Sequence, residues 1–222
     1  RYIAYFQSFT NTYAPISRLR ELYTAAMAPE DVVVLSVATR PDCLPEETVN
    51  LLAELNRIKP VWVELGLQTI HPESAAWIRR GYDLPVFEQA VRQLRAVGIS
   101  VIVHQILGLP GETPEQMVET ARYIGKSGAS GVKFHLLHVL RGTDLEPLWR
   151  AGAVTCLEQD AYIKILEACL RNIPREMVVH RLTGDGAKRD LLAPLWSADK
   201  KRVLSAINTA FQQDNLEQGS DL

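Results

Sequence analysis

The stretch that decides the fold is Val61-Trp62-Val63-Glu64-Leu65-Gly66-Leu67-Gln68. Its alternation is typical of a β-strand, because successive strand side chains point to opposite faces. The aliphatic residues then share one face, and Trp62, Glu64, Gly66 and Gln68 share the other. Helical patterns flank the stretch, so a parallel strand covered on both faces is expected. A covered carboxylate and amide need hydrogen-bond partners, which predicts a barrel or sheet whose inner face holds a polar ligand.

The rest of the chain alternates between strand and helix patterns. Strands are predicted over residues 2–9, 32–39, 61–67, 101–107, 132–139 and 177–180. Helices are predicted over residues 16–28, 73–80, 86–97, 158–171 and 199–211, with two more that begin near Glu46 and, after a capping box, at Pro114. Residues 212–222 are expected to be a frayed tail. Strands that recur about every 30 to 40 residues indicate βα units, and therefore a parallel barrel or a doubly wound sheet.

The composition is that of a globular domain. The chain has 222 residues, of which 47% are hydrophobic and 23% charged, enough for one sizeable core. A net charge of -2 gives no overall basic field for non-specific nucleic-acid binding. No apolar run approaches the roughly 20 residues of a membrane span, and no signal peptide is visible. The three widely spaced cysteines disfavour a disulfide framework and favour the cytosol.

Polar residues gather at the carboxyl ends of the predicted strands, where the active sites of parallel βα folds lie. In strand order they are Gln7, Ser8, Thr10, Asn11 and Thr12; Ser36, Thr39, Arg40 and Asp42; Glu64, Gln68 and His71; His104 and the loop at residues 108–112; Lys133, His135, His138 and Arg141; and His180 and Arg181. This pattern favours an enzyme over a scaffold, without naming a reaction.

Several of these residues also have ordinary structural interpretations. Arg40 and Asp42 could form a turn around Pro41, and Glu64 and Gln68 could pair with each other. The loop at residues 108–112 could be only a tight strand-to-helix turn, although its glycines equally permit close approach to a ligand.

The histidines and cysteines can also be interpreted as either functional or structural residues. His135 and His138 are three residues apart, so a regular strand points them to opposite faces, and one of them is expected to be structural. Cys169 lies on an apolar helical stripe and is expected in the core. The cysteines form neither CxxC nor CxxxCxxC, and the histidines lack HExxH spacing. There is no P-loop, GxGxxG or GxSxG, so no metal ligand or nucleotide loop is predicted in this chain.

Six segments resemble the radical S-adenosylmethionine (SAM) superfamily, and within it the YhcC-like family of predicted iron–sulfur oxidoreductases, which is related to the elongator-type proteins. The segments are FQSFTNTYA at 6–14, TRPDC at 39–43, ELGLQT at 64–69, GLPGE at 108–112, KFHLLH at 133–138 and LAPLW at 192–196. The resemblance covers nearly the whole chain. It implies an α/β fold, a partial (β/α)6 TIM-like barrel, with a core over residues 1–198 and a C-terminal helix and tail over residues 199–222.

The chain departs from this family in one respect. The defining CxxxCxxC, which holds a [4Fe–4S] cluster after the first strand, is absent, and residues 2–9 match the family's second strand. Since the chain opens with Arg1 at the edge of a predicted strand, we expect an N-terminal truncation that removes the first strand and the cluster loop. This fragment alone should then lack the cluster and be inactive.

The resemblance implies a SAM site at the strand ends. The implied cofactor-binding residues are Gln7, Ser8 and Thr10 for the methionyl amino group; Ser36, Arg40, Glu64 and Gln68 for the ribose and carboxylate; and Gly108, Leu137 and His138 for the adenine. The forked guanidinium of Arg40 suits a carboxylate. Four residues remain for the substrate side, namely His104, Lys133, His135 and Arg181.

In the intact enzyme, the resemblance implies that the cluster reduces the SAM sulfonium to give a 5′-deoxyadenosyl radical, which abstracts hydrogen from the substrate. An electron donor such as flavodoxin or ferredoxin, and a small-molecule or tRNA substrate, follow by the same analogy. Two alternatives stay open. One is a cluster-free TIM-barrel lyase or isomerase that uses Lys133 and Glu64 as base or Schiff-base partner, and the other is a non-catalytic SAM-binding domain.

Overall fold

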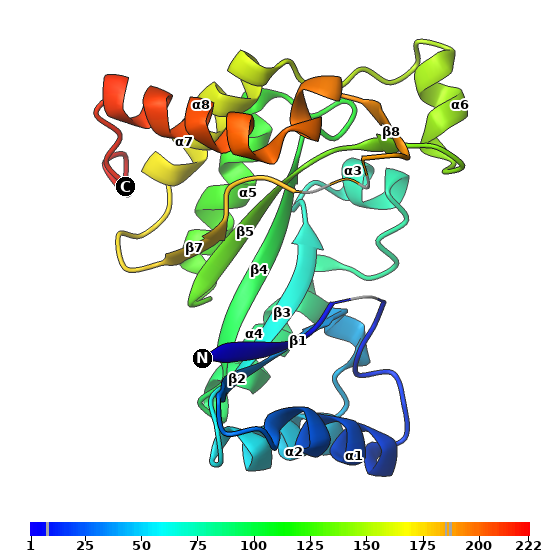
Figure 1. The fold of residues 1–222 in the computed structure, drawn as a ribbon, viewed down its shortest axis with the longest axis vertical. Coiled ribbons are helices and arrows are strands. Elements are labelled where there is room, and N and C mark those ends of the chain that lie inside the picture. The colour runs from blue at the N-terminus through cyan, green and yellow to red at the C-terminus, as the bar shows by residue number, and fades with distance from the viewer. Residues whose placement is uncertain (8, 185, 187) are drawn as a thin grey trace.

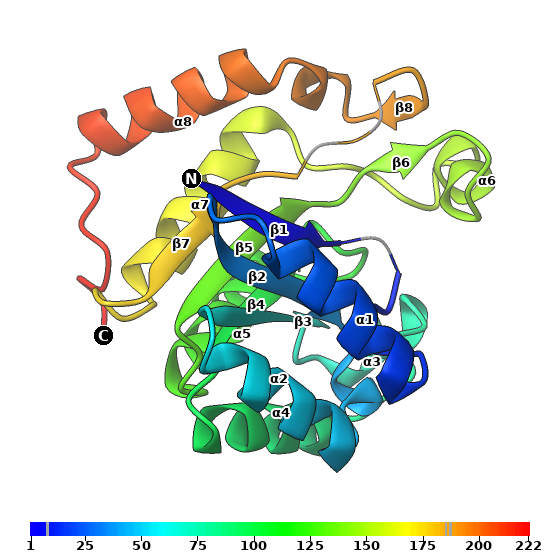
Figure 2. The ribbon, with the colours of Figure 1, turned by 60° about the horizontal axis from the view of Figure 1, so that its bottom comes forward.

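The computed structural model describes residues 1–7, 9–184, 186 and 188–222. Its centre is a parallel sheet in the order β1-β2-β3-β4-β5-β7. The strands are β1 Tyr2–Phe6, β2 Val32–Thr39, β3 Val61–Gln68, β4 Ser100–Leu107, β5 Gly131–Leu136 and β7 Val178–Arg181. The sheet curls into a half-barrel with helices on its outer side (Figures 1 and 2). The predicted partial (β/α) barrel is therefore confirmed.

The helices that cover the sheet follow the predicted order. They are α1 Ile16–Met27, α2 Glu46–Asn56, α3 Pro72–Trp77, α4 Leu84–Ala96, α5 Pro114–Lys126 and α7 Gln159–Arg171. The capping box predicted before α5 is present, because the Thr113 hydroxyl accepts from the Gln116 amide while the Gln116 side chain accepts from Thr113. Gly98 follows α4 with φ of +75°, a left-handed conformation that suits the end of a helix.

The two faces of β3 divide as the alternation predicts. Val61, Val63, Leu65 and Leu67 are all almost fully buried, and they join the hydrophobic core between sheet and helices. Glu64 is also buried, on the opposite, inner face of the half-barrel. The apolar face thus holds the sheet against its helices and leaves the polar residues of the strands to line the interior.

A second, smaller sheet was not predicted. β6 Val139–Leu140 and β8 Leu191–Ala193 pair antiparallel, beside the short helix α6 Leu145–Arg150. The predicted strand over residues 132–139 is therefore two elements, because β5 ends at Leu136 and the chain turns before β6. The first predicted strand is shorter as well: β1 ends at Phe6.

The prediction of a frayed tail is wrong. α8, Lys200–Gln213, continues past residue 211, and the chain after it folds back along α7. The Gln218 side chain donates to carbonyl oxygens before β7 at 2.6 and 2.8 Å, and the Asp221 amide donates to the Arg171 carbonyl at 3.0 Å. The apolar face of α8 joins the main core through Val203 and Ile207. The division at residue 198 stays a prediction.

Over the described ranges, no helix combines the length and the apolar character needed to cross a membrane.

Candidate functional site

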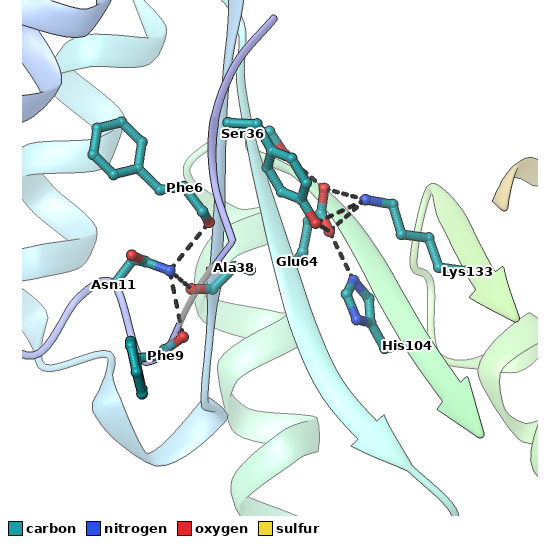
Figure 3. A network of polar contacts seen from close by, with 9 residues as sticks. Phe6, Phe9, Asn11, Ser36, Ala38, Glu64, His104 and Lys133 are labelled. Carbon is teal, nitrogen blue, oxygen red and sulfur yellow. Dashed lines mark hydrogen bonds and ion pairs between the residues drawn. The ribbon is translucent and has the colours of Figure 1, made fainter. Parts of the chain in front are cut away.

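The inner face of the half-barrel carries a buried carboxylate held by side chains from four other strands (Figure 3). Glu64 on β3 accepts from Ser36 Oγ at 2.6 Å, from His104 Nε2 at 2.7 Å and from the Tyr5 hydroxyl at 2.9 Å. Lys133 Nζ lies 2.7 and 2.6 Å from its two oxygens, and the Glu64 side chain is only 2% exposed. Gln68, which the structural interpretation would pair with Glu64, is not among these contacts.

These contacts fix the charge of Glu64. Burial would raise the pKa of its carboxyl group, but hydrogen bonds from His104, Lys133 and Ser36 outweigh burial and hold it well below its ordinary value of 4.5. Burial, and then the Glu64 charge, raise the pKa of Tyr5, which therefore stays a donor. Both carboxylate oxygens are occupied, so a ligand hydroxyl would have to displace one of these donors.

A cavity of about 430 Å³ opens at the carboxyl ends of the strands, beside this network. It brings together many of the predicted site residues, namely Gln7, Arg40, Glu64, Gln68, His104 and His135. Ser36 and Lys133 do not line the cavity; they support Glu64. Arg80 and Tyr82 also line it, although no sequence motif assigned them to a site.

The end of β3 has an unusual backbone held by Arg80 and Tyr82. Gln68 has φ of +69°, a left-handed value that is rare outside glycine. The Arg80 guanidinium, 8% exposed, donates to the carbonyls of Leu67 and Thr69 at 3.4 and 2.6 Å, and the Tyr82 hydroxyl donates to the Gly66 carbonyl. Strained residues of this kind concentrate at ligand sites. An arginine before a glycine at the end of a predicted helix was the only sequence signal here.

Arg40 does not present a free fork to this cavity. Its guanidinium makes a bidentate pair with Asp42 at 2.9 and 2.7 Å, inside a 3-10 turn over Pro41–Cys43. The central guanidinium carbon, Cζ, of Arg40 lies 5.6 Å from the centre of the Tyr82 ring. The turn interpretation of Arg40 therefore describes the contacts, and a ligand carboxylate would have to replace Asp42.

The loop after β1 is fastened to β2 by Asn11. Its side chain amide donates to the carbonyls of Phe6 at 3.1 Å and Ala38 at 2.9 Å (Figure 3). Thr10 lies in this loop, outside the cavity lining. Ser8, expected beside it, lies outside the described residues. Asn11 thus shapes the segment for which the resemblance implies the methionyl contact.

His135 and His138 have separate surroundings. His135 lines the cavity, and its ring centre lies 4.9 Å from that of His104. Burial, and then the neighbouring His104, Arg181 and Lys133, lower the pKa of His135 to about 3. Its Nε2 is buried without a hydrogen-bond partner among the described residues. His138 follows the end of β5, and its Nε2 lies 3.0 Å from the Ser197 hydroxyl.

The residues expected near adenine lie side by side after β4 and β5. The Leu137 amide donates to the Leu107 carbonyl at 3.0 Å. Gly108 has φ of +90°, and an added Cβ there would lie 3.1 Å from Leu157, so a side chain would be strained and crowded. Glu112, later in the same loop, accepts from the Thr69 hydroxyl at 2.5 Å and ties the loop to the end of β3.

The three cysteines occupy separate places in the fold, and Cys43 Sγ lies 3.9 Å from Asp42 Oδ1, beside the Arg40–Asp42 pair. Cys169 is buried in the core, as predicted. Cys43 and Cys156 are half-buried, and burial raises the pKa of both thiols. In the part of the chain that the structure describes, no group of three or more His, Cys, Asp or Glu side chains could hold a metal ion.

Replacing His135 with Gln should flatten the loss of stability in mild acid. Between pH 6.5 and about 3, the unfolded His135 binds a proton that the folded one does not, so stability falls as pH falls. At pH 5 this difference is about 2 kcal/mol. His180, whose pKa burial lowers, acts in the same direction, whereas Glu64 contributes only below its ordinary pKa of 4.5. Urea unfolding at pH 7.5, 6.5 and 5.0 tests this; parallel curves for variant and parent would contradict it.

Comparisons with known proteins identify the family of this chain. The sequence profile of the Radical SAM superfamily matches residues 1–124, and that of the Radical_SAM C-terminal domain matches residues 129–213. The uncharacterized protein YtqA of Bacillus subtilis is 46% identical over 99% of this chain and 68% of its own length. Protein YhcC of Escherichia coli is 36% identical over 100% and 72%.

A solved structure shares the fold. The archaeal Methanocaldococcus infernus Elp3 superposes with a TM-score of 0.75 over 91% of this chain and 46% of that one, at 21% identity. This likeness supports the half-barrel architecture alone. With its profile match and its identity to YtqA and YhcC along nearly the whole length, the chain belongs to the radical SAM superfamily.

Proposed function

We propose that this chain is the core of an enzyme that binds SAM in the cavity at the carboxyl ends of β1 to β5 and, together with a [4Fe–4S] cluster, cleaves it reductively. One observation carries the proposal. The segment that matches the superfamily, residues 1–124, is the segment whose strands supply most of the polar inner face and the 430 Å³ cavity. Cavities of this size and polarity are typical of small-molecule and cofactor sites.

The residues present fit SAM. The strained Gln68 and the amide of Gln7 offer polar contacts inside the cavity, and Arg40 would meet the carboxylate by exchanging Asp42 for it. We expect the backbone at Gly108 to contact the adenine. When bound and reduced, SAM supplies a 5′-deoxyadenosyl radical that abstracts hydrogen from a substrate. The half-barrel positions both molecules and limits the access of water.

The described residues do not fit the cluster. The three cysteines lie in separate places, and no group of described ligands could hold a metal ion. No step is therefore assigned to the cluster on this chain, and we expect the chain by itself not to cleave SAM. The cytosol, and a one-electron donor such as flavodoxin or ferredoxin, suit this chemistry. Small molecules and tRNA are the candidate substrates.

The cluster-free lyase or isomerase is the less supported alternative. It needs the Lys133 amine to attack a carbonyl or accept a proton. Lys133 Nζ instead lies within 2.7 Å of both Glu64 oxygens and 3.2 Å from the Tyr5 hydroxyl. An amine committed to these contacts is not available as a nucleophile.

Formation of 5′-deoxyadenosine tests the proposal. The full-length protein is reconstituted anaerobically with iron and sulfide, reduced and given SAM, and the product is measured by chromatography, with the 222-residue chain as control. We expect product from the full-length protein and none from the chain. A full-length protein with a verified cluster and no product would overturn the proposal. Calorimetric titration with SAM would then separate a binding domain, which binds it, from a cluster-free enzyme, which does not.

A further inference from the structure

Among the described residues, Arg181 is a positive charge on the inner face of the half-barrel without a carboxylate partner. The carboxylate of Glu64 is balanced by Lys133 at 2.6 Å. Arg181, at the end of β7, is half-buried, and no carboxylate of the described ranges lies within ion-pair distance of it. Because a half-buried guanidinium is normally paired or hydrogen-bonded, Arg181 is a candidate for ligand binding.

The neighbours of Arg181 place its charge on the inner face. β5 and β7 pair in parallel, and after a register shift at Val132 the next pair places Lys133 beside Arg181. Burial and the Glu64 charge raise the pKa of Tyr5, and Arg181 is the group that opposes them; burial, His104 and then Arg181 lower the pKa of His135. Tyr5 and His135 come from β1 and β5 and both belong to the inner face. Because Arg181 acts electrostatically on both Tyr5 and His135, its guanidinium points into the half-barrel.

His135 supplies a second unsatisfied group on the same wall. Its Nε2 is buried and has no hydrogen-bond partner among the described residues. The residue lines the 430 Å³ cavity, and Gly184, without a side chain, packs against its other nitrogen. Buried polar atoms in folded proteins nearly always have a partner, so an orphan in a cavity indicates a ligand atom.

We propose that the substrate carries an anionic group, a carboxylate or a phosphate, which binds Arg181 and accepts a hydrogen bond from His135 on the wall formed by β5 and β7. The guanidinium fork matches the two oxygens of either group, and a neutral imidazole donates through its Nε2. This inference rests on the proposed function, because His135 lines the cavity proposed for SAM, and Arg181 lies on β7, the strand next to β5.

An NMR titration tests the site in the 222-residue chain. The histidine side chains are labelled with ¹⁵N, and inorganic phosphate is added at pH 7.5 and constant ionic strength. We expect a saturable shift of the His135 signals, and binding at least tenfold weaker in Arg181→Gln. Arg189→Gln is the matched control, since the Arg189 side chain is 90% exposed and, of the residues that the structure describes, pairs with its neighbour Asp190 alone. No saturable shift, or equal binding in Arg181→Gln, would overturn the site.

Further arms identify the source of the anion. Acetate replaces phosphate in a parallel titration, and the tighter of the two indicates the substrate group. S-adenosylhomocysteine is then added to the phosphate-bound chain. Displacement of phosphate would assign Arg181 to the cofactor carboxylate and overturn the substrate assignment, whereas simultaneous binding supports it.

A conservative variant separates the fork from the charge. Arg181→Lys keeps the positive charge and should bind phosphate several-fold more weakly than the parent. This variant tests the site even if Arg181→Gln does not fold. Equal binding by Arg181→Lys would overturn the bidentate contact. The titration needs neither SAM cleavage nor a cluster. Phosphate binding at His135 in a protein that forms no 5′-deoxyadenosine would contradict the proposed function and leave the anion site standing.

Discussion

Replacing Glu64 with Gln is expected to lower the free energy of unfolding by about 3–5 kcal/mol. The change removes the only carboxylate that lies against Lys133 among the described residues, while the Lys133 side chain is just 10% exposed. The isolated ammonium group keeps the cost of leaving water and loses the attraction that offset it. The amide also cannot accept from all the donors that surround Glu64, so Ser36 or His104 loses its partner. Urea unfolding at pH 7.5 measures the effect.

The partner variants show whether the effect belongs to the pair. Lys133→Met alone should also destabilise, and Glu64→Gln combined with Lys133→Met should recover much of the loss, because neither charge is then left unpaired. Glu21→Gln is the matched surface control: it breaks the exposed pair with Arg18 and should change stability by less than about 1 kcal/mol. A loss below about 1 kcal/mol in Glu64→Gln would mean that the carboxylate does not hold the half-barrel together.

The sequence predicted the framework because the framework rests on local patterns. The alternation in β3 identifies both its faces, and the Thr113 capping box marks the start of α5. Elements whose sequences show no hydrophobic periodicity were not predicted. β6 and β8 have two and three residues, too few for any alternation to be recognised. The polar tail gave no apolar pattern, and its order comes from backbone contacts and from Gln218, which no periodicity reports.

The site was predictable in its position and less so in its contacts. A carboxylate on a covered strand face had to find partners, and this reasoning correctly singled out Glu64. The partners themselves come from distant segments, since Lys133 is 69 residues away in the chain, and Gln68, the nearby candidate, is not one of them. From the sequence, Tyr5 was expected to be only one of the aromatic residues of the first strand. Its hydroxyl joins the network only because β1 curls over the inner face.

Arg80 shows what the sequence could not reveal, and its substitution by Lys should have the second large effect. The guanidinium donates to the carbonyls of Leu67, Thr69 and Tyr82, and its carbon lies 4.8 Å from the centre of the Tyr82 ring. A lysine ammonium cannot reproduce this planar set of donors. We expect a loss of roughly 2–4 kcal/mol in the segment that Arg80 fastens, because buried carbonyls lose charged donors.

The consequence for function follows from Gln68. Its left-handed φ of +69° persists only while the surrounding contacts over-determine it. In Arg80→Lys we expect faster hydrogen exchange at the amides of residues 66–82 than in the parent, unchanged protection in β4, and at least a tenfold lower yield of 5′-deoxyadenosine from the full-length protein. Arg92→Lys, at an exposed arginine near Glu88, is the control and should match the parent. Faster exchange throughout the sheet would mean that Arg80 stabilises the whole fold, whereas a change confined to residues 66–82 makes it the residue that shapes the cavity.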